Sequence, residues 1–161
     1  MAIYDVHLIR VFEAPIERVW RAWTDPGDLR EWWGPTGFSC PVATVDLRVG
    51  GHIFATMKAP PEYGGLEQHS TWTFTELERP NVIRYRFEFC DAAGTVISPT
   101  EAGIPEGVPA LGEHEVLLTD LSDGRTGLEM TERGYTNSEV RDLSAMGLEQ
   151  CLDKMAALVE V

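Results

Sequence analysis

Hydrophobic and polar positions along the chain change their spacing twice, and the resulting stretches predict different elements. Residues 3–12 are rich in β-branched and aromatic side chains, which predicts a first strand. Two short helices are expected next: Pro15 suits the first position of one helix, while Asp25 and Pro26 suit the cap and first position of another. A Gly-Pro pair at 34–35 ends the second helix.

From residue 42 to about residue 133 the apolar positions alternate with the period of two that is typical of strands. The alternation is clearest in VIRYRFEF at 82–89, which places isoleucine and aromatic side chains on one face and charged side chains on the other. A Gly-Gly pair at 50–51 interrupts the pattern as a bulge or tight turn would, after the strand predicted at 44–49. Because no helix separates these strands, we predict an antiparallel sheet.

Helical spacing returns in the last part of the chain and predicts one amphipathic helix over about 138–159. Thr136 and Glu139 form a candidate capping box at its start. A helix of this length could cross the whole sheet and cover its apolar face. We expect its buried face to include Leu143, Cys151 and Met155.

Gly147 lies inside this predicted helix, where glycine costs about 1 kcal/mol relative to alanine. Close approach of the helix to the sheet would explain it, and so would room for a ligand against the helix. The long irregular stretch at 91–113, rich in glycine and proline, has two explanations as well: a mobile lid over an opening, or a disordered insertion.

Composition narrows the classes of partner. The chain of 161 residues suits one domain spanning 1–161, and its net charge of −13 disfavours nucleic acid and anionic membranes, which require a basic surface. No apolar run approaches the ~20 residues of a membrane span, and the N-terminus does not resemble a signal peptide, so we expect a cytoplasmic protein. A homodimer and a protein partner both stay open.

The three cysteines, Cys40, Cys90 and Cys151, lie far apart and form no cluster with histidine. We therefore expect buried, reduced thiols without a disulfide and no bound metal. No phosphate-binding glycine loop or nucleophilic serine motif is present, and we expect no organic cofactor.

Several short motifs in the sequence resemble those of one superfamily, and together they extend over nearly the whole chain. The matching stretches are Ala14-Pro15-x-Glu17-x-Val19-Trp20, Trp23-Thr24-Asp25-Pro26, Trp32-Trp33-Gly34-Pro35, Asp46-x-Arg48-x-Gly50-Gly51 and Met146-Gly147. They resemble the START-like (SRPBCC) superfamily, and within it the branch of the activator of the 90-kDa heat-shock protein ATPase. This resemblance implies an α+β helix-grip fold, with a curved antiparallel sheet around the C-terminal helix and a cavity between them. Related sequences usually carry tryptophan after the helix glycine, where this chain has Leu148.

Adjacent Trp32 and Trp33 cannot both face one core from a single helix, so we expect one to be buried and the other to face the cavity mouth or solvent. His52 shares a strand face with Phe54, and His114 lies on the apolar face of another strand, so both histidines are candidates for orienting a polar ligand group. The full set of candidate ligand-binding residues is Trp32, Trp33, His52, Phe54, Trp72, Phe74, Tyr85, Phe87, His114, Met130, Met146 and Leu148.

Glu132 alternates with Leu128 and Met130, which would turn its carboxylate inward, unless the strand frays there or the side chain is exposed. Three functions remain open. The first is binding of a small hydrophobic molecule in an apolar cavity. The second is a cyclase- or hydrolase-type enzyme that uses His52 or His114 and needs a polar group of shifted pKa in the cavity. The third is a chaperone-associated interaction protein, as the name of the branch suggests.

Overall fold

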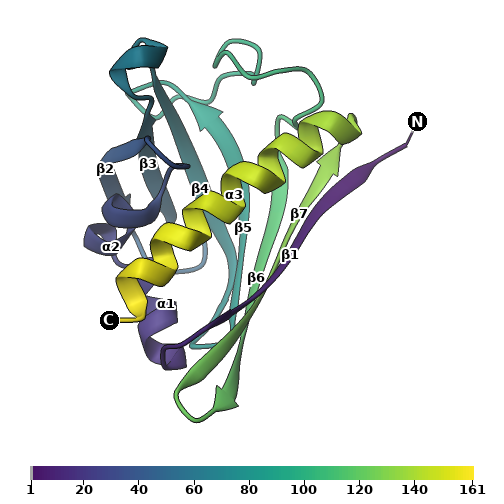
Figure 1. Ribbon diagram of the computed structural model, residues 1–161. Helices are drawn as coiled ribbons and strands as arrows, with labels where there is room; N and C mark the ends of the chain where they lie inside the picture. The colour runs from purple at the N-terminus through teal and green to yellow at the C-terminus, as the bar shows by residue number, and fades with distance from the viewer. Residues whose placement is uncertain (1) are drawn as a thin grey trace.

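Seven antiparallel strands form one curved sheet in the order β1-β7-β6-β5-β4-β3-β2 (Figure 1). The structure is a computed structural model that describes residues 2–161. Its strands are β1 (Tyr4–Phe12), β2 (Ser39–Val45), β3 (His52–Lys58), β4 (Glu67–Glu78), β5 (Val82–Cys90), β6 (Gly112–Ser122) and β7 (Arg125–Tyr135). Each neighbouring pair runs antiparallel, which confirms the sheet predicted from the alternating pattern.

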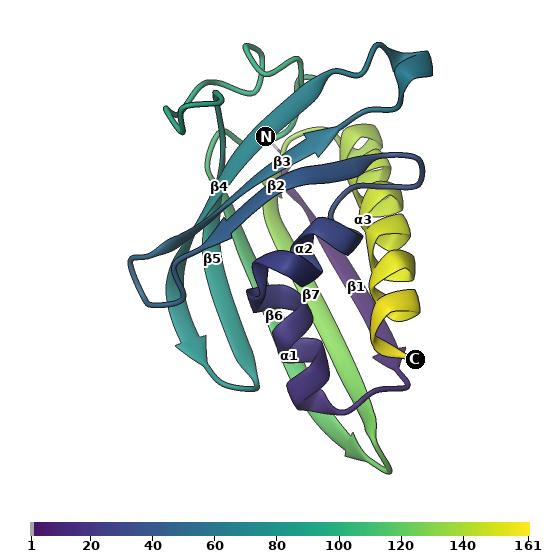
Figure 2. The same cartoon turned by 90° about the vertical axis from the view of Figure 1, so that its left-hand side faces the viewer.

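The longest helix lies across the inner face of this sheet. Two short helices lie beside the C-terminal half of that long helix (Figures 1 and 2). The helices are α1 (Ile16–Thr24), α2 (Pro26–Trp32) and α3 (Ser138–Val159), with a short 3-10 turn, η1, at Pro61–Tyr63. This arrangement is the predicted α+β helix-grip fold. None of the helices in residues 2–161 is long and apolar enough to cross a membrane.

Helices α1 and α2 are joined through capping and an indole hydrogen bond. The Asp25 carboxylate accepts the backbone N–H of Asp28 at 2.9 Å, which caps α2 as the sequence predicts. Trp32 is fully buried, and its Nε1 donates to the Ala22 carbonyl at 2.7 Å. Its ring packs edge-on against Trp23 with the ring centroids 4.8 Å apart. The two helices therefore form one unit that closes an end of the core.

Helix α3 begins one residue later than the capping-box interpretation requires. Asn137 is the N-cap, and its side-chain oxygen accepts the N–H groups of Glu139 and Val140 at 2.9 and 3.1 Å. The predicted cap at Thr136 is therefore wrong. Asn137 supplies the same acceptor from the adjacent position.

The two halves of α3 have different surroundings. The C-terminal half is packed into the core, and its buried residues include Cys151, Leu152, Met155 and Val159. Leu143, in the N-terminal half, is 59 % exposed, so the expectation that it would be buried is wrong. The reason is that this half of the helix lies over an unfilled space, described below, and Leu143 stands at its rim.

Strand β2 lies earlier in the sequence than the strand predicted for this region. The pattern favoured a strand at 44–49, whereas β2 ends at Val45 and the chain turns through 46–51. Gly50 has a φ of +85°, and a Cβ on Gly51 would collide with the Asp46 carbonyl. The Gly-Gly pair therefore forms a tight turn, which removes the preceding residues from the sheet.

Candidate ligand-binding pocket

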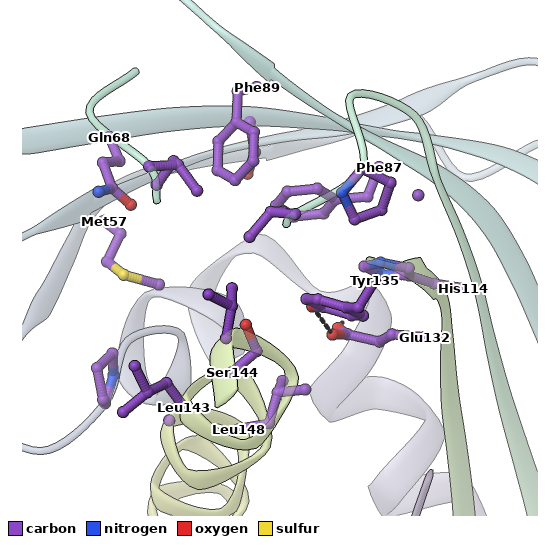
Figure 3. A pocket seen from close by; sticks show the side chains of 18 of the residues that line it. Met57, Gln68, Phe87, Phe89, His114, Glu132, Tyr135, Leu143, Ser144 and Leu148 are labelled. Carbon is purple, nitrogen blue, oxygen red and sulfur yellow. Dashed lines mark hydrogen bonds and ion pairs between the residues drawn. The ribbon is translucent and has the colours of Figure 1, made fainter. Parts of the chain in front are cut away.

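A pocket of about 290 Å³ lies between the N-terminal half of α3 and the inner face of the sheet (Figure 3). Side chains from β3, β4 and β5 face it from one side, and side chains of α3 face it from the other. The apolar part of the lining includes Trp33, Met57, Phe87, Phe89, Val140 and Leu148. Concave sites with such linings are typical of small-molecule binding.

The long connection between β5 and β6 covers one side of this pocket. Four of its apolar residues line the space: Ile104, Pro105, Val108 and Pro109. The Gly107 carbonyl accepts the N–H of Thr136 at 2.9 Å, which ties the connection to the start of α3. At a φ of +111°, Gly107 also approaches Asn137 so closely that an added Cβ would lie 2.6 Å from that side chain. Glycine at position 107 therefore allows the backbone of the connection to lie directly against the start of α3, beside the pocket.

Gly147 borders open space on the pocket side of α3. A Cβ built on this glycine would meet no atom within 4 Å, apart from its chain neighbours and its own helix backbone. Close approach of helix and sheet, one of the two explanations for a glycine here, is therefore excluded. Gly147 lines the pocket and leaves room against the α3 backbone.

One end of the pocket is polar. Glu132 is 5 % exposed, and its Oε1 accepts the hydroxyl hydrogen of Tyr135 at 2.8 Å. Its Oε2 lies 3.4 Å from Nδ1 of His114. That separation lies within ion-pair range, but the alignment does not make a hydrogen bond, and Nδ1 has no hydrogen-bond partner among residues 2–161. Ser144 of α3 faces the same end (Figure 3).

An irregularity in β7 brings Glu132 and Tyr135 together. Glu132 pairs with Val6 and Tyr135 with Tyr4, so β7 has one residue more than β1 between these pairs. Gly134 lies in this bulge with a φ of +103°. Because successive side chains of a regular strand alternate between faces, only the extra residue lets both side chains point inward.

His114 is held between aromatic rings. The Phe87 ring stacks on its imidazole with the centroids 5.1 Å apart, and Tyr85 packs against it edge-on at 5.2 Å. A Cβ on Gly112 would lie 2.8 Å from Nε2, so glycine at that position makes room for the ring. Burial lowers the pKa of His114, and the nearby Glu132 carboxylate opposes only part of this shift. The imidazole is therefore neutral at neutral pH.

The tyrosines at this end keep their protons. Burial is the largest cause of a raised pKa at both Tyr85 and Tyr135, and the negative charge of Glu132 raises both further. Tyr135 is therefore a hydroxyl donor to Glu132 over the whole neutral range.

The predicted candidates fall into three groups. Trp33, Phe87, His114 and Leu148 line the pocket. A second group is buried in the core next to the pocket without lining it: Trp32, Trp72, Phe74, Tyr85 and Met130. Trp33 links these groups, because its ring lies 4.8 Å from that of Trp72 and 6.4 Å from that of Phe87.

Three candidates lie away from the pocket. His52 is exposed, and Phe54 lies on the same outer face of β3, where it stacks on His69 at 5.8 Å. The inner face of β3 instead carries Ile53 and Ala55, so the assignment of its faces was reversed. Met146 is 54 % exposed because it lies on the solvent side of α3, next to the glycine that faces the pocket.

Several lining residues were not among the candidates. Tyr135 lies beyond the strand predicted from alternation, and the glycine before it is the one sequence signal of the bulge that turns it inward. Glu132 does point inward, and neither fraying nor exposure occurs. Met57 and Ser144 also line the space: Met57 lies on the face of β3 opposite to the one chosen from the sequence, and Ser144 is a polar residue outside the apolar stripe expected for α3.

Metal-binding clusters of three or more histidine, cysteine or acidic side chains do not occur within residues 2–161. Cys40, Cys90 and Cys151 are free and buried. Burial raises the pKa of Cys90 and of Cys151 to about 11, so both are protonated at neutral pH. The polar groups that line the pocket include the Tyr135 and Ser144 hydroxyls, the His114 imidazole and the Glu132 carboxylate.

The curved sheet, the long helix across it and the pocket between them define a START-like helix-grip protein. The family model described as "Activator of Hsp90 ATPase homolog 1-like protein" matches residues 13–160, and the chain belongs to that family.

Solved structures agree with this assignment. A crystal structure of a protein from Chromobacterium violaceum is 31 % identical, with a TM-score of 0.77 over 98 % of this chain and 97 % of that one. A solution structure from Arthrobacter aurescens is similar in fold at 23 % identity, with a TM-score of 0.77 over 96 % and 85 % of the two chains. A crystal structure described as the AHSA1 protein from Silicibacter pomeroyi shares the fold at 20 % identity, with a TM-score of 0.72 over 96 % of each chain. A search of curated proteins found no match.

Proposed function

We propose that the protein binds a small, largely apolar molecule in the pocket between the sheet and α3. The observation that carries this proposal is the space at Gly147, where an added Cβ would meet nothing within 4 Å. Protein interiors are otherwise packed about as densely as organic crystals. Space of this kind, lined by aromatic and aliphatic side chains, favours an apolar ligand over solvent.

The lining suggests how such a ligand would be held. Trp33 and Phe87 offer ring faces from two different elements, and Leu148 offers an aliphatic surface from α3. The connection between β5 and β6 would cover the ligand through Ile104 and Val108. Binding would then remove apolar surface on both partners from water, which contributes about 25 cal/mol per Å² buried.

The proposal rests on the pocket and not on the name of the family. That name refers to activation of a chaperone ATPase, whereas proteins of one fold often differ in function. The pocket, in contrast, is built from side chains of this chain.

The test is to fill the pocket and measure binding. Butylbenzene and phenylbutanol are titrated into the wild type and into Gly147→Leu, whose new side chain would occupy the open space. The matched control is Ala157→Leu, which places the same side chain on the exposed face of the same helix. Replacing a helical glycine favours the helix, so Gly147→Leu is expected to fold, which circular dichroism checks.

We expect binding to the wild type and to Ala157→Leu, and at least about a tenfold loss of affinity in Gly147→Leu, which corresponds to ~1.4 kcal/mol. Equal affinity in the two variants would contradict the proposal. So would the failure of both compounds to bind the wild type up to their solubility limits.

A further inference from the structure

The polar end of the pocket has a buried carboxylate that is incompletely paired. Glu132 is 5 % exposed, and the Tyr135 hydroxyl satisfies its Oε1. Its Oε2 lies 3.4 Å from Nδ1 of His114 without a hydrogen bond, and Nδ1 has no other partner in residues 2–161. A charge buried in this way is costly unless it is paired.

No arginine or lysine within residues 2–161 forms an ion pair with Glu132, whose one ion-pair neighbour there is His114. Arg133, the next residue on β7, is 49 % exposed at its side chain and lies 3.9 Å from Glu115 instead. Burial keeps the His114 imidazole neutral, as described above. This end of the pocket therefore holds a buried carboxyl group that no arginine or lysine side chain of residues 2–161 accompanies.

Aromatic side chains surround the same end. Phe87 stacks on His114 with the centroids 5.1 Å apart, and Tyr85 packs edge-on against the same imidazole at 5.2 Å. The faces of such rings are negatively polarised and attract cations. The net charge of −13 on the whole chain also raises the local concentration of cations and lowers that of anions.

We infer that the ligand of this pocket is a small cationic amine with an apolar body, whose ammonium group binds at Glu132. An ammonium group has three N–H donors and no acceptor. Glu132 Oε2 supplies the charged acceptor, and the hydroxyl of Ser144 and the imidazole of His114 line the same end. The apolar body then lies toward Trp33 and Leu148. This inference rests on the proposed function, because it specifies the ligand of the same pocket.

Other ligand classes fit this end less well. A carboxylate or phosphate group would place a second negative charge beside Glu132, and no basic side chain is there to offset it. A hydroxyl group could donate one hydrogen bond to Oε2 but would leave the charge unpaired. The preferred order is therefore amine, alcohol, then anion.

The experiment compares compounds that differ in one group. Phenylbutylamine, phenylbutanol, phenylbutyrate and butylbenzene are titrated separately into the wild-type protein at neutral pH, with heat of binding as the readout. We expect the amine to bind at least about tenfold more tightly than the alcohol, because its ammonium group pairs with the carboxylate charge, whereas the alcohol donates one hydrogen bond and leaves that charge unpaired. Phenylbutyrate is expected to bind most weakly of the three polar compounds.

Two variants test whether the preference for the amine over the alcohol comes from the Glu132 carboxylate. Glu132→Gln keeps the shape of the side chain and removes its charge, so the amine should lose its advantage over the alcohol, to within about twofold. The matched control is Glu129→Gln on the same strand, where the side chain is 47 % exposed and pairs with His7 outside the pocket. The alcohol also reports folding, because a folded Glu132→Gln protein should bind it about as well as the wild type does.

The outcomes separate the two proposals. If neither butylbenzene nor phenylbutanol binds the wild type, the proposed function itself fails. If butylbenzene and phenylbutanol bind but the amine binds no more tightly than the alcohol, only the amine inference is overturned. The same holds if phenylbutyrate binds best, or if the amine keeps its advantage in a folded Glu132→Gln protein. The comparison of the four compounds on the wild type needs no variant, so it tests the amine inference even if Glu132→Gln does not fold.

Discussion

Tyr135 donates its hydroxyl hydrogen to Glu132 inside the protein at 2.8 Å, although the two residues lie three positions apart on one strand. In a regular strand these side chains would lie on opposite faces. The bulge at Gly134 rotates Tyr135 inward, so the polar end of the pocket depends on one irregular position in β7.

Replacing Tyr135 with phenylalanine should destabilise the protein by about 1–3 kcal/mol, because a buried carboxylate loses the one hydrogen-bond donor it has among residues 2–161. Urea unfolding of Tyr135→Phe against the wild type measures this change. Tyr63→Phe serves as the control, since Tyr63 is 69 % exposed and its hydroxyl faces solvent. Equal effects of the two substitutions would show that the Tyr135 hydrogen bond contributes nothing particular to stability.

Two glycines should respond in opposite directions to alanine. Gly147→Ala should stabilise the protein by up to about 1 kcal/mol, because the new methyl group enters open space and alanine favours the helix. Gly134→Ala should destabilise it, because Gly134 has a φ of +103° that alanine adopts only with strain. Thermal unfolding of both variants measures the signs, and a destabilising Gly147→Ala would contradict the open space at that position.

The two halves of α3 should differ in their tolerance of truncation. Met155→Ala is expected to cost about 2–5 kcal/mol, because Met155 is fully buried in the core. Leu143→Ala should change stability by no more than about 0.5 kcal/mol, because its side chain is 59 % exposed. Denaturant midpoints of the two variants test this contrast, which similar losses would contradict.

Alkaline pH should destabilise the folded state through Cys151. Burial raises the pKa of this thiol from its ordinary value of 9.0 to about 11, so between these values the unfolded chain has released the proton and the folded chain still holds it. Stability is therefore lost as the pH rises through this window, because the folded state binds more protons there. Cys151→Ala should show a shallower decline of unfolding free energy with pH, whereas Leu152→Ala should lower the curve and keep its slope.

The connection between β5 and β6 should become more ordered when the pocket is filled. Ile104 and Val108 line the space that a ligand would occupy, so binding should slow amide hydrogen exchange at 98–110. The hairpin turn at 122–125 lies outside the pocket lining and supplies an internal control. Unchanged exchange in the connection on saturation with phenylbutanol would rule out a lid.

The elements could be predicted from sequence because each depends on local spacing. The alternation at 82–89 and the helical period after residue 138 both report which side chains are buried, and a sheet needs a helix to cover its apolar face. The Asp25 cap was equally local, since its acceptor lies within one turn of its donor.

The pocket itself could be predicted only in part. Which tryptophan of the pair faces the core depends on the path of the chain after α2, which puts Trp33 against Trp72 of a distant strand. The face of β3 was assigned the wrong way round because its apolar residues do not alternate cleanly, with Phe54 outside and Ala55 inside. The inward direction of the Tyr135 side chain depends on a bulge. A bulge moves every later residue of the strand to the face opposite to the one that regular alternation predicts.

The two ends of helix α3 have different roles: the C-terminal end packs in the core, and the N-terminal end lines the pocket. Its last turns hold Leu152 and Met155 in the core, whereas Ser144 and Gly147 border empty space. Under the proposed function, substitutions in those earlier turns would alter the ligand that the pocket accepts at little cost to folding, because few packed contacts are lost there. Proteins of this fold could therefore, under the proposed function, differ in ligand through a few positions of one helix while the rest of the architecture stays the same.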